Sequence, residues 1–203
     1  MHDYAIFGHD RASVGRWLGF GSILISGGIN QFFIKLSAVS GWEAFTKGTV
    51  TVGIVYMVLH WLFNKWAWSK APYIDIPDLT GIWEVDGKTL DESGNTKYPW
   101  EGELDIEQNW KQISVNVKTR KSRSKSYTAT LMKRSGVRGG WVLSYSYKNE
   151  PNLDQIHELQ GHKGYCEIEF NSELTHAEAT YFNSGGRKTY GIMSIKRAQH
   201  DRL

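Results

Sequence analysis

The chain begins with two long apolar segments and continues with a region in which apolar and polar residues alternate. Residues 17–34 run for eighteen positions without a formal charge, and residues 48–64 do so for seventeen. A membrane-spanning helix needs about 20 mostly apolar residues, with roughly 17 as the lower limit. A soluble helical hairpin would show a polar stripe at the helical period, and neither segment has one. The pattern predicts a membrane-anchoring helical hairpin over residues 1–71, with helices at about 17–36 and 48–68.

The flanks of the two segments support this interpretation. Trp17, Trp61 and Trp66 lie near their ends, where Trp collects at membrane interfaces. The first ten residues contain two Asp and no Lys or Arg, which is unlike a cleaved signal peptide. Lys and Arg are more frequent outside the hairpin than in its loop, which favours both termini in the cytoplasm. We therefore expect a multi-pass membrane protein with a cytoplasmic C-terminal domain.

The first apolar segment is rich in small and amide side chains. Small residues let helices approach closely in lipid, and polar side chains at membrane depth need partners. Two interpretations stay open, packing of the two helices within one chain or assembly between chains. The residues concerned are Gly15, Gly19, Ser22, Ser26, Asn30 and Gln31.

After a linker at residues 72–80, which has two prolines, the apolar period changes to two. Alternation of this kind predicts half-buried strands. Eight such strands within residues 81–203 predict an all-β, antiparallel, minimal barrel of lipocalin-like type, because closure removes exposed edges. A barrel of this size has room for side chains or for one small ligand. The predicted strands are residues 80–85, 100–107, 112–119, 127–133, 140–147, 164–170, 177–182 and 190–197.

Composition narrows the functional classes. The mean hydropathy of the whole chain is −0.43, although its N-terminal part is apolar. Residues 72–203 carry equal numbers of basic and acidic side chains, which argues against DNA or RNA as a partner. Cys166 is the only cysteine, so no intrachain disulfide forms.

Neither a metal site nor a catalytic site is predicted. His157 and His162 are five residues apart, which does not fit the four-residue spacing of helical metalloprotease ligands. No Ser–His–Asp set and no paired carboxylates stand out, so the residues predict no catalytic site and no cofactor.

Two segments are candidates for ligand binding. Residues 118–126, "KTRKSRSKS", hold five basic residues and three serines. They form a solvated loop, contact anionic lipid, or bind phosphate through Arg and hydroxyl groups. Tyr145 and Tyr147 fall on one face of a predicted strand, where they stack on bases or fill the core.

The first predicted strand contains Gly81-x-Trp83, and Arg197 lies on the last. This pair is similar to the lipocalin arrangement, in which Arg packs over a Trp that closes the barrel floor. We expect a structural role for Trp83.

Taken in order, these segments resemble a known family. "DLTGIWEV", "IEQNWKQISVNVKTRKSRSKS", "LSYSYKN" and "HKGYCEIEF" follow a helical hairpin, as in the two-transmembrane-helix, β-barrel membrane effectors of bacterial CBASS anti-phage defence. The resemblance implies that a cognate nucleotidyltransferase makes a cyclic di- or trinucleotide, which the cytosolic barrel binds. It further implies that the helices then form a homo-oligomer that disrupts the inner membrane and kills the infected cell.

The resemblance and the residue types together nominate a set of binding residues. Arg120 and Arg187 are expected at phosphates, Tyr145 and Tyr147 at bases, and hydroxyl groups in orienting contacts. One slip in strand register would reverse which of these side chains point inward. The full set is Thr119, Arg120, Ser122, Ser124, Tyr145, Tyr147, His162, Tyr181 and Arg187.

Two other functions remain possible from the sequence. A membrane-tethered, lipocalin-like carrier or sensor would have an apolar cavity and ignore nucleotides. A scaffold would have a filled barrel that binds nothing small.

Overall fold

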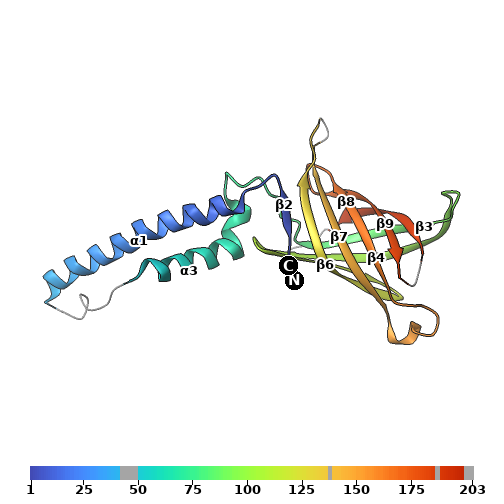
Figure 1. Ribbon diagram of the computed structural model, residues 1–203, viewed down its shortest axis with the longest axis horizontal. Coiled ribbons are helices and arrows are strands. Elements are labelled where there is room, and N and C mark those ends of the chain that lie inside the picture. The colour runs from blue at the N-terminus through green and yellow to red at the C-terminus, as the bar shows by residue number, and fades with distance from the viewer. Residues whose placement is uncertain (42–49, 137–138, 186–187, 199–203) are drawn as a thin grey trace. The chain divides into compact units, whose positions relative to one another are not determined.

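The computed structural model describes residues 1–41, 50–136, 139–185 and 188–198. The chain divides into two compact units, one of residues 9–74 and one that combines residues 1–8 with residues 75–203. The first is helical and the second is a β-barrel (Figure 1).

The helical unit contains a long helix and a shorter one that lie side by side (Figure 1). Helix α1 spans Arg11–Ser40. Its N-cap is Asp10, whose carboxylate accepts from the Ala12 N–H, and its C-cap is Gly41. Gly41 has a φ of 68°, a left-handed conformation that suits glycine at a helix end. Helix α1 is long and apolar enough to cross a membrane. It extends beyond the predicted residues 17–36, to an N-terminus capped by the Asp10 side chain and a C-terminus where the Gly41 N–H donates to the Ser37 carbonyl.

The second helical segment changes form along its length. Helix α3 spans Val52–Leu62, the π-helix η1 spans Phe63–Ala67, and the 3₁₀ turn η2 spans Trp68–Lys70. The predicted helix over residues 48–68 therefore corresponds to a helical run that begins at residue 52. Residues 48 and 49 lie outside the described residues.

Polar side chains of α1 find partners within the chain. Ser22 and Ser26 are buried, and the Ser26 hydroxyl donates to the Val50 carbonyl at 2.6 Å. The Asn30 side chain donates to the same carbonyl and accepts from the Val50 N–H at 3.1 Å. Packing within the chain thus accounts for these three residues, whereas Gln31 is exposed.

Eight antiparallel strands form the barrel. They follow the order β5-β4-β3-β10-β9-β8-β7-β6, and pairing between β5 and β6 closes the sheet. This confirms the predicted fold class. The strands are β3 (Gly81–Leu90), β4 (Thr96–Gln108), β5 (Gln112–Thr119), β6 (Ser122–Lys133), β7 (Trp141–Pro151), β8 (His162–Phe170), β9 (His176–Ser184) and β10 (Tyr190–Arg197).

Several strands are longer than the alternation predicted, and β6 shows why. Its first residues place Ser124 and Ser126 inside and Arg123 and Lys125 outside. Both faces are therefore polar, and no apolar period marks this part of the strand. The predicted start at residue 127 is wrong for that reason.

The N-terminal residues belong to the barrel unit, whereas the sequence pattern placed residues 1–8 in the membrane-anchoring unit. Strand β1 (His2–Asp3) pairs with β5, and strand β2 (Ala5–Phe7) pairs in parallel with β6. The direct pairing of β5 and β6 ends at Asn116 and Lys125. Residues 1–8 lie beyond that point, between β5 and β6, where the edges of these two strands would otherwise be unpaired.

The two ends of the barrel differ. At the start of β3, Trp83 is fully buried and its indole N–H donates to the Leu79 carbonyl at 3.1 Å. The Arg197 guanidinium lies 5.1 Å from the Trp83 ring, as the lipocalin-like pattern predicted. This end is a packed floor, and the cavity lies toward the other end of the strands.

Candidate ligand-binding site

A cavity of about 740 Å³ opens at the end of the barrel away from Trp83. That volume lies in the range of small-molecule sites. Aromatic residues line its depth, namely Trp100 from β4, Tyr145 and Tyr147 from β7, and Tyr181 from β9. The barrel interior is therefore neither filled nor purely apolar.

Glycines on neighbouring strands make room for three of these rings. Gly87 lies directly opposite Trp100, Gly164 opposite Tyr147, and Gly191 opposite Tyr181. A Cβ atom at each glycine would lie 2.1 Å, 2.4 Å and 2.7 Å from the facing aromatic side chain. Each ring thus lies over a bare stretch of backbone, which fixes its orientation in the wall.

Hydrogen bonds hold the aromatic hydroxyl groups in place. The Tyr181 hydroxyl bonds to the Thr89 hydroxyl at 2.8 Å and accepts from the Trp100 indole N–H at 3.2 Å. The Tyr147 hydroxyl donates to the Asn183 side-chain oxygen at 2.6 Å. In turn, the Asn183 amide donates to the Thr189 hydroxyl at 2.6 Å. These bonds preorganise the wall before any ligand enters.

Burial keeps the deep wall neutral. It raises the pKa of Tyr147 and of Tyr145 above the usual tyrosine value. Burial also raises the pKa of the Cys166 thiol to about 12. At neutral pH these groups offer aromatic surface and hydrogen bonds without negative charge, so they do not repel an anionic ligand.

Positive charge lies at the rim of the cavity, on the turn that joins β5 to β6. Arg120 and Lys121 line the cavity there, and both are exposed. The Thr119 hydroxyl shapes the turn by accepting from the Ser122 N–H at 3.1 Å. The Asn149 amide donates to the Ser122 hydroxyl at 3.1 Å, which ties the turn to β7.

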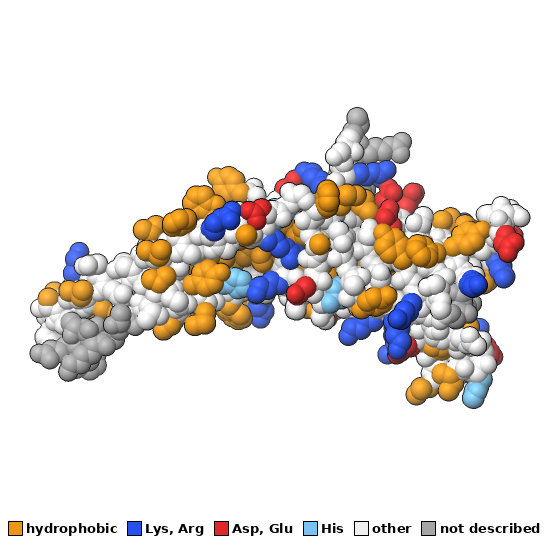
Figure 2. Space-filling model, viewed as in Figure 1, with side chains coloured by type: hydrophobic (Ala, Val, Ile, Leu, Met, Phe, Trp, Pro, Cys, Tyr) orange, Lys and Arg blue, Asp and Glu red, His pale blue; other side chains and the backbone are white. Residues whose placement is uncertain are grey.

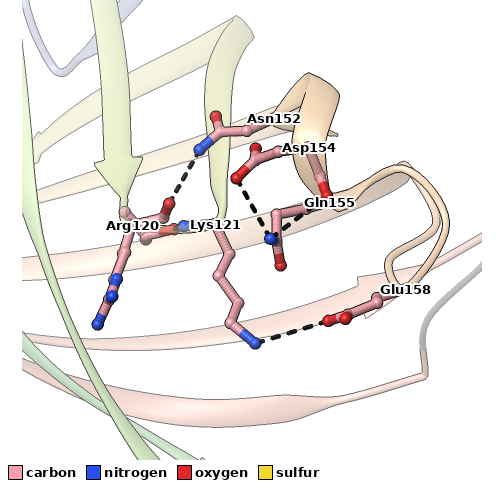
Figure 3. Close-up of polar contacts among 7 residues, drawn as sticks. Arg120, Lys121, Asn152, Asp154, Gln155 and Glu158 are labelled. Carbon is pink, nitrogen blue, oxygen red and sulfur yellow. Dashed lines mark hydrogen bonds and ion pairs between the residues drawn. The ribbon is translucent and has the colours of Figure 1, made fainter.

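A neighbouring loop holds this turn from its other side (Figure 3). The Asn152 amide donates to the Arg120 carbonyl at 2.9 Å, and Lys121 lies 3.9 Å from the Glu158 carboxylate. The Arg120 guanidinium points away from these contacts in Figure 3. Within the described part of the chain it forms no ion pair, so its two-pronged donor set is available for phosphate oxygens.

The structure brings eight of the nine predicted residues to one cavity. They form its wall or rim, and Arg187 lies outside the described residues. The eight are Thr119, Arg120, Ser122, Ser124, Tyr145, Tyr147, His162 and Tyr181.

Several residues of the cavity were not predicted from the sequence. Trp100 is the first residue of the predicted strand 100–107, whereas Thr89, Asn149 and Asn183 lie beyond the ends of the predicted strands. The glycines at 87, 164 and 191 were a usable signal, because glycine inside a strand marks the close approach of another group.

A second hollow, of about 890 Å³, lies on the outer surface near the β5–β6 seam. Exposed charges of both signs line it, including Glu103, Lys118, Arg123, Lys148 and Glu150. It has no buried aromatic group. The inner cavity is therefore the better candidate for a specific ligand. Among residues 1–41, 50–136, 139–185 and 188–198, no three His, Cys, Asp or Glu side chains come together to hold a metal ion.

Comparison with known proteins assigns the family. Residues 74–197 match the family described as "Cap15, cyclic dinucleotide receptor domain", and residues 12–69 match "Cap15, TM helices". The chain belongs to the Cap15 family. It is 35% identical over 212 aligned residues to CD-NTase-associated protein 15 of Yersinia aleksiciae, and 98% of each chain is covered.

The two Cap15 matches coincide with the two structural units. The receptor match contains every strand from β3 to β10 and so the whole cavity. The membrane match contains most of α1 and all of α3. The chain is thus a CBASS-associated, membrane-associated Cap15 protein with a cyclic dinucleotide receptor domain, and Cap15 is a receptor family and not a known family of enzymes.

Proposed function

We propose that this chain is a CBASS effector whose barrel binds a cyclic dinucleotide in the inner cavity, and that binding drives assembly of its membrane helices. The assembled helices disrupt the inner membrane and kill the infected cell. The barrel lies in the cytoplasm, where the cognate nucleotidyltransferase releases its product. One observation carries the proposal, a neutral aromatic cavity with a cationic rim inside a domain that matches cyclic dinucleotide receptors.

The cavity suits the chemistry of such a ligand. Cyclic dinucleotides combine two flat bases with two phosphates. Tyr145, Tyr147 and Trp100 offer surfaces for the bases, and stacking contributes about 1–3 kcal/mol per base in single-strand binders. Arg120 and Lys121 offer charge to the phosphates, with Ser122 supplying a hydroxyl. Arg187 remains a predicted phosphate contact.

The segment that connects the barrel to the first membrane helix is short. Strand β2 ends at Phe7 and α1 begins at Arg11, so three residues join the barrel sheet to the long helix. A ligand shifts an equilibrium only by binding one state better than the other. In this proposal, a ligand-induced change in β5 and β6 reaches α1 through β1 and β2, which pair with these two strands.

Helix α1 retains small residues that are free for contacts with other chains. A Cβ atom added at Gly21 or Gly28 would meet nothing within 4 Å in the described chain. These positions are seven residues apart and fall on one side of the helix. Close helix–helix approach in lipid uses such positions, which supports assembly between chains.

Thermal unfolding of the full chain in detergent tests ligand binding directly. Cyclic di-AMP, cyclic di-GMP, cyclic di-UMP, cyclic GMP-AMP and a cyclic trinucleotide form the panel. A ligand at 100 times its Kd stabilises the folded state by about 2.7 kcal/mol. We expect one of them to raise the Tm and the others to have little effect. No shift with any nucleotide, together with a shift on adding fatty acids, would instead favour the apolar carrier.

The first variant to test is Arg120→Ala. It removes a rim cation but no buried contact, so affinity should fall about tenfold or more while the Tm without ligand stays unchanged. Arg123→Ala is the matched control, because Arg123 lies three residues away on the outer face and does not line the cavity. Equal affinity of both variants would remove Arg120 from the site.

A further inference from the structure

The outer wall of the barrel is divided by charge. Strand β6 contains three basic residues and no Asp or Glu, and β5 beside it contains one basic residue and no acidic one. Strands β4 and β3 lie two and three strands away from β6, and their outward side chains include six carboxylates. Separate sectors of opposite charge orient a molecule in an external field, such as that of a charged membrane. The six carboxylates are Glu84, Asp86, Glu101, Glu103, Asp105 and Glu107.

The basic side chains of β5–β8 lie directly opposite one another. On β5 and β6, Lys118 is opposite Arg123. Lys125, Lys148 and Lys163 form a row across β6, β7 and β8. Like charges in such positions destabilise an antiparallel pair. All five side chains are exposed, so an anion outside the chain can relieve the repulsion.

Few of these cations are neutralised within the chain. They line the outer hollow near the β5–β6 seam. The Lys148 ammonium pairs with Glu150 at 2.7 Å, and Lys118 is directly opposite Glu103. The other three cations form no ion pair with any residue of the described ranges. Figure 2 shows Lys and Arg side chains gathered over the lower part of the barrel, where β6 and β7 run in Figure 1.

Exposed apolar side chains extend this basic sector along β6. Tyr127 is 48% exposed and Met132 41%. Phe7, on β2, lies directly beside Met132 and is 71% exposed. Aromatic and aliphatic side chains beside Lys and Arg are typical of surfaces that enter a membrane interface. We call this surface the β6 face, defined by Phe7, Lys118, Arg123, Lys125, Tyr127, Met132, Lys148 and Lys163.

The chain keeps the β6 face close to a bilayer. Residues 12–69 match the Cap15 membrane helices, and α1 begins four residues after Phe7. Four residues span at most about 14 Å. That length is comparable to the distance of about 8 Å over which exposed charges attract one another at physiological ionic strength. A bilayer is therefore within reach of this face at all times, whereas a soluble acidic partner is not.

We propose that the β6 face rests on the anionic headgroups of the membrane that holds the helices. The cations meet lipid phosphates, Phe7, Tyr127 and Met132 enter the interface, and the acidic side of β3 and β4 faces away. None of the residues of the β6 face lines the inner cavity, so a docked barrel can still take up its ligand. The inference goes beyond the proposed function, since neither nucleotide binding nor helix assembly requires the barrel to touch lipid.

Fluorescence quenching of the full chain in nanodiscs, with one chain per disc, tests the contact without neighbouring copies. A fluorophore at Thr130→Cys reports on the outer side of β6. Ser194→Cys is the matched control, on β10, four strands from β6 in either direction around the barrel. Cys166 is buried and its pKa is raised, so it reacts slowly with maleimides.

The discs contain phosphatidylcholine with or without phosphatidylglycerol, and all hold the same lipid with a nitroxide on its headgroup. We expect the nitroxide to quench the Thr130→Cys probe at least about twofold more in the discs with phosphatidylglycerol. The Ser194→Cys probe should be quenched equally in both, because β10 faces away from the bilayer.

Removal of charge tests the role of the cations, in the Thr130→Cys background. One triple variant replaces three unpaired cations of the β6 face, and a control triple replaces three exposed lysines of β3, β4 and β10. Each cation near an anionic surface contributes about fivefold to the contact equilibrium, so only the first triple should lose the extra quenching. It also removes like-charge neighbours, so it should stay folded. The variants are Arg123→Ser/Lys125→Ser/Lys163→Ser and Lys88→Ser/Lys97→Ser/Lys196→Ser.

The results separate failure of this inference from failure of the proposed function. Equal quenching of the Thr130→Cys probe in the two kinds of disc overturns the docking, and so does a first triple that keeps the extra quenching. An equal loss in the control triple also overturns it, because net charge and not this face would then attract the lipid. The proposed function fails separately, if no cyclic nucleotide raises the Tm. The first triple should keep the nucleotide-dependent rise in Tm, since none of its three residues lines the cavity.

Discussion

At the scale of single residues, the cavity depends on matched pairs of a glycine and an aromatic ring across neighbouring strands. The Tyr147 ring lies over Gly164, and its hydroxyl donates to Asn183. The ring position is therefore set by two strands at once. A binding wall of this kind is sensitive to small changes at residues that themselves contact no ligand.

Gly164→Ala tests this dependence. A Cβ atom at residue 164 would lie 2.4 Å from the Tyr147 ring, so the ring must move into the cavity. We expect ligand affinity to fall at least about tenfold, with a loss of stability of roughly 1–3 kcal/mol from overpacking. Isothermal titration with the activating nucleotide and a thermal melt measure the two effects. Gly94→Ala, at a position with open space, is the control for a glycine change in general, although its φ of 83° adds local strain.

The buried thiol of Cys166 makes the stability of the barrel depend on pH in the alkaline range. Its pKa is raised from 9.0 to about 12 by burial, so the folded state keeps the proton that the unfolded state loses. A raised pKa of this sign contributes stability that is complete below pH 9 and is lost as the pH rises toward 12. The free energy of unfolding should fall by up to about 1.4 kcal/mol per pH unit in this window.

Cys166→Ala isolates that contribution. Without the thiol, the decline should begin near pH 10, where tyrosines of the unfolded chain ionise. Denaturant titrations at pH 8, 9 and 10 compare the two proteins. Identical slopes between pH 8 and pH 10 would show that Cys166 does not titrate differently in the folded state.

At the scale of elements, residues 1–8 act as a strap across the β5–β6 seam. The Ser126 hydroxyl lies where these strands separate, accepting from the Val115 N–H at 2.9 Å and bonding to the His2 ring at 2.7 Å. Tyr4 is buried, and its hydroxyl donates to the Asn109 carbonyl at 3.2 Å. The strap thus replaces sheet pairing that β5 and β6 do not make with each other.

Tyr4→Ala should reveal what the strap contributes. It removes a buried ring and a hydrogen bond, and we expect a loss of about 3 kcal/mol, measured as the Tm of the full chain in detergent. Phe7→Ala is the matched control on the same strap, since Phe7 is 71% exposed. Equal Tm values for the two variants would show that the strap does not stabilise the barrel.

At the scale of the whole molecule, the two units divide the proposed work between sensing and membrane assembly. The barrel unit is interrupted in the sequence between Gly8 and Asp75, and the helical unit lies in that interval. The helical unit is therefore an insertion between the strap and the rest of the barrel. Removing it cleanly requires keeping residues 1–8.

A chain in which a flexible linker replaces residues 9–74 should bind the same nucleotide with similar affinity and no longer permeabilise liposomes. A chain that lacks residues 1–74 loses the strap as well, and it should show a lower Tm. Calorimetry, dye release and thermal melts measure the three properties. Dye release by the linker-joined barrel would contradict the membrane mechanism.

The sequence determined the classes of element and their order. Uncharged runs predicted helices that suit a membrane, since charge is costly in lipid. Alternation predicted eight strands, since one face of each strand meets the core and the other meets water. Aromatic, hydroxyl and guanidinium groups in neighbouring predicted strands and turns nominated the site residues, and eight of the nine line one cavity, although their role in binding stays a prediction. The family resemblance supplied the ligand class, which residue patterns alone left open.

Only the tertiary structure decided where the remaining residues act. The predicted strand at residues 127–133 was too short, because the first residues of β6 are polar on both faces. Which of these side chains point into the barrel depends on the pairing of β6 with β7. Residues 1–8 were assigned to the membrane helices because two- and three-residue strands carry no period, and their place depends on a seam made by residues more than 100 positions away. Trp100 and Asn183 became cavity residues through cross-strand register alone. Register joins segments distant in the chain, so local pattern cannot specify it.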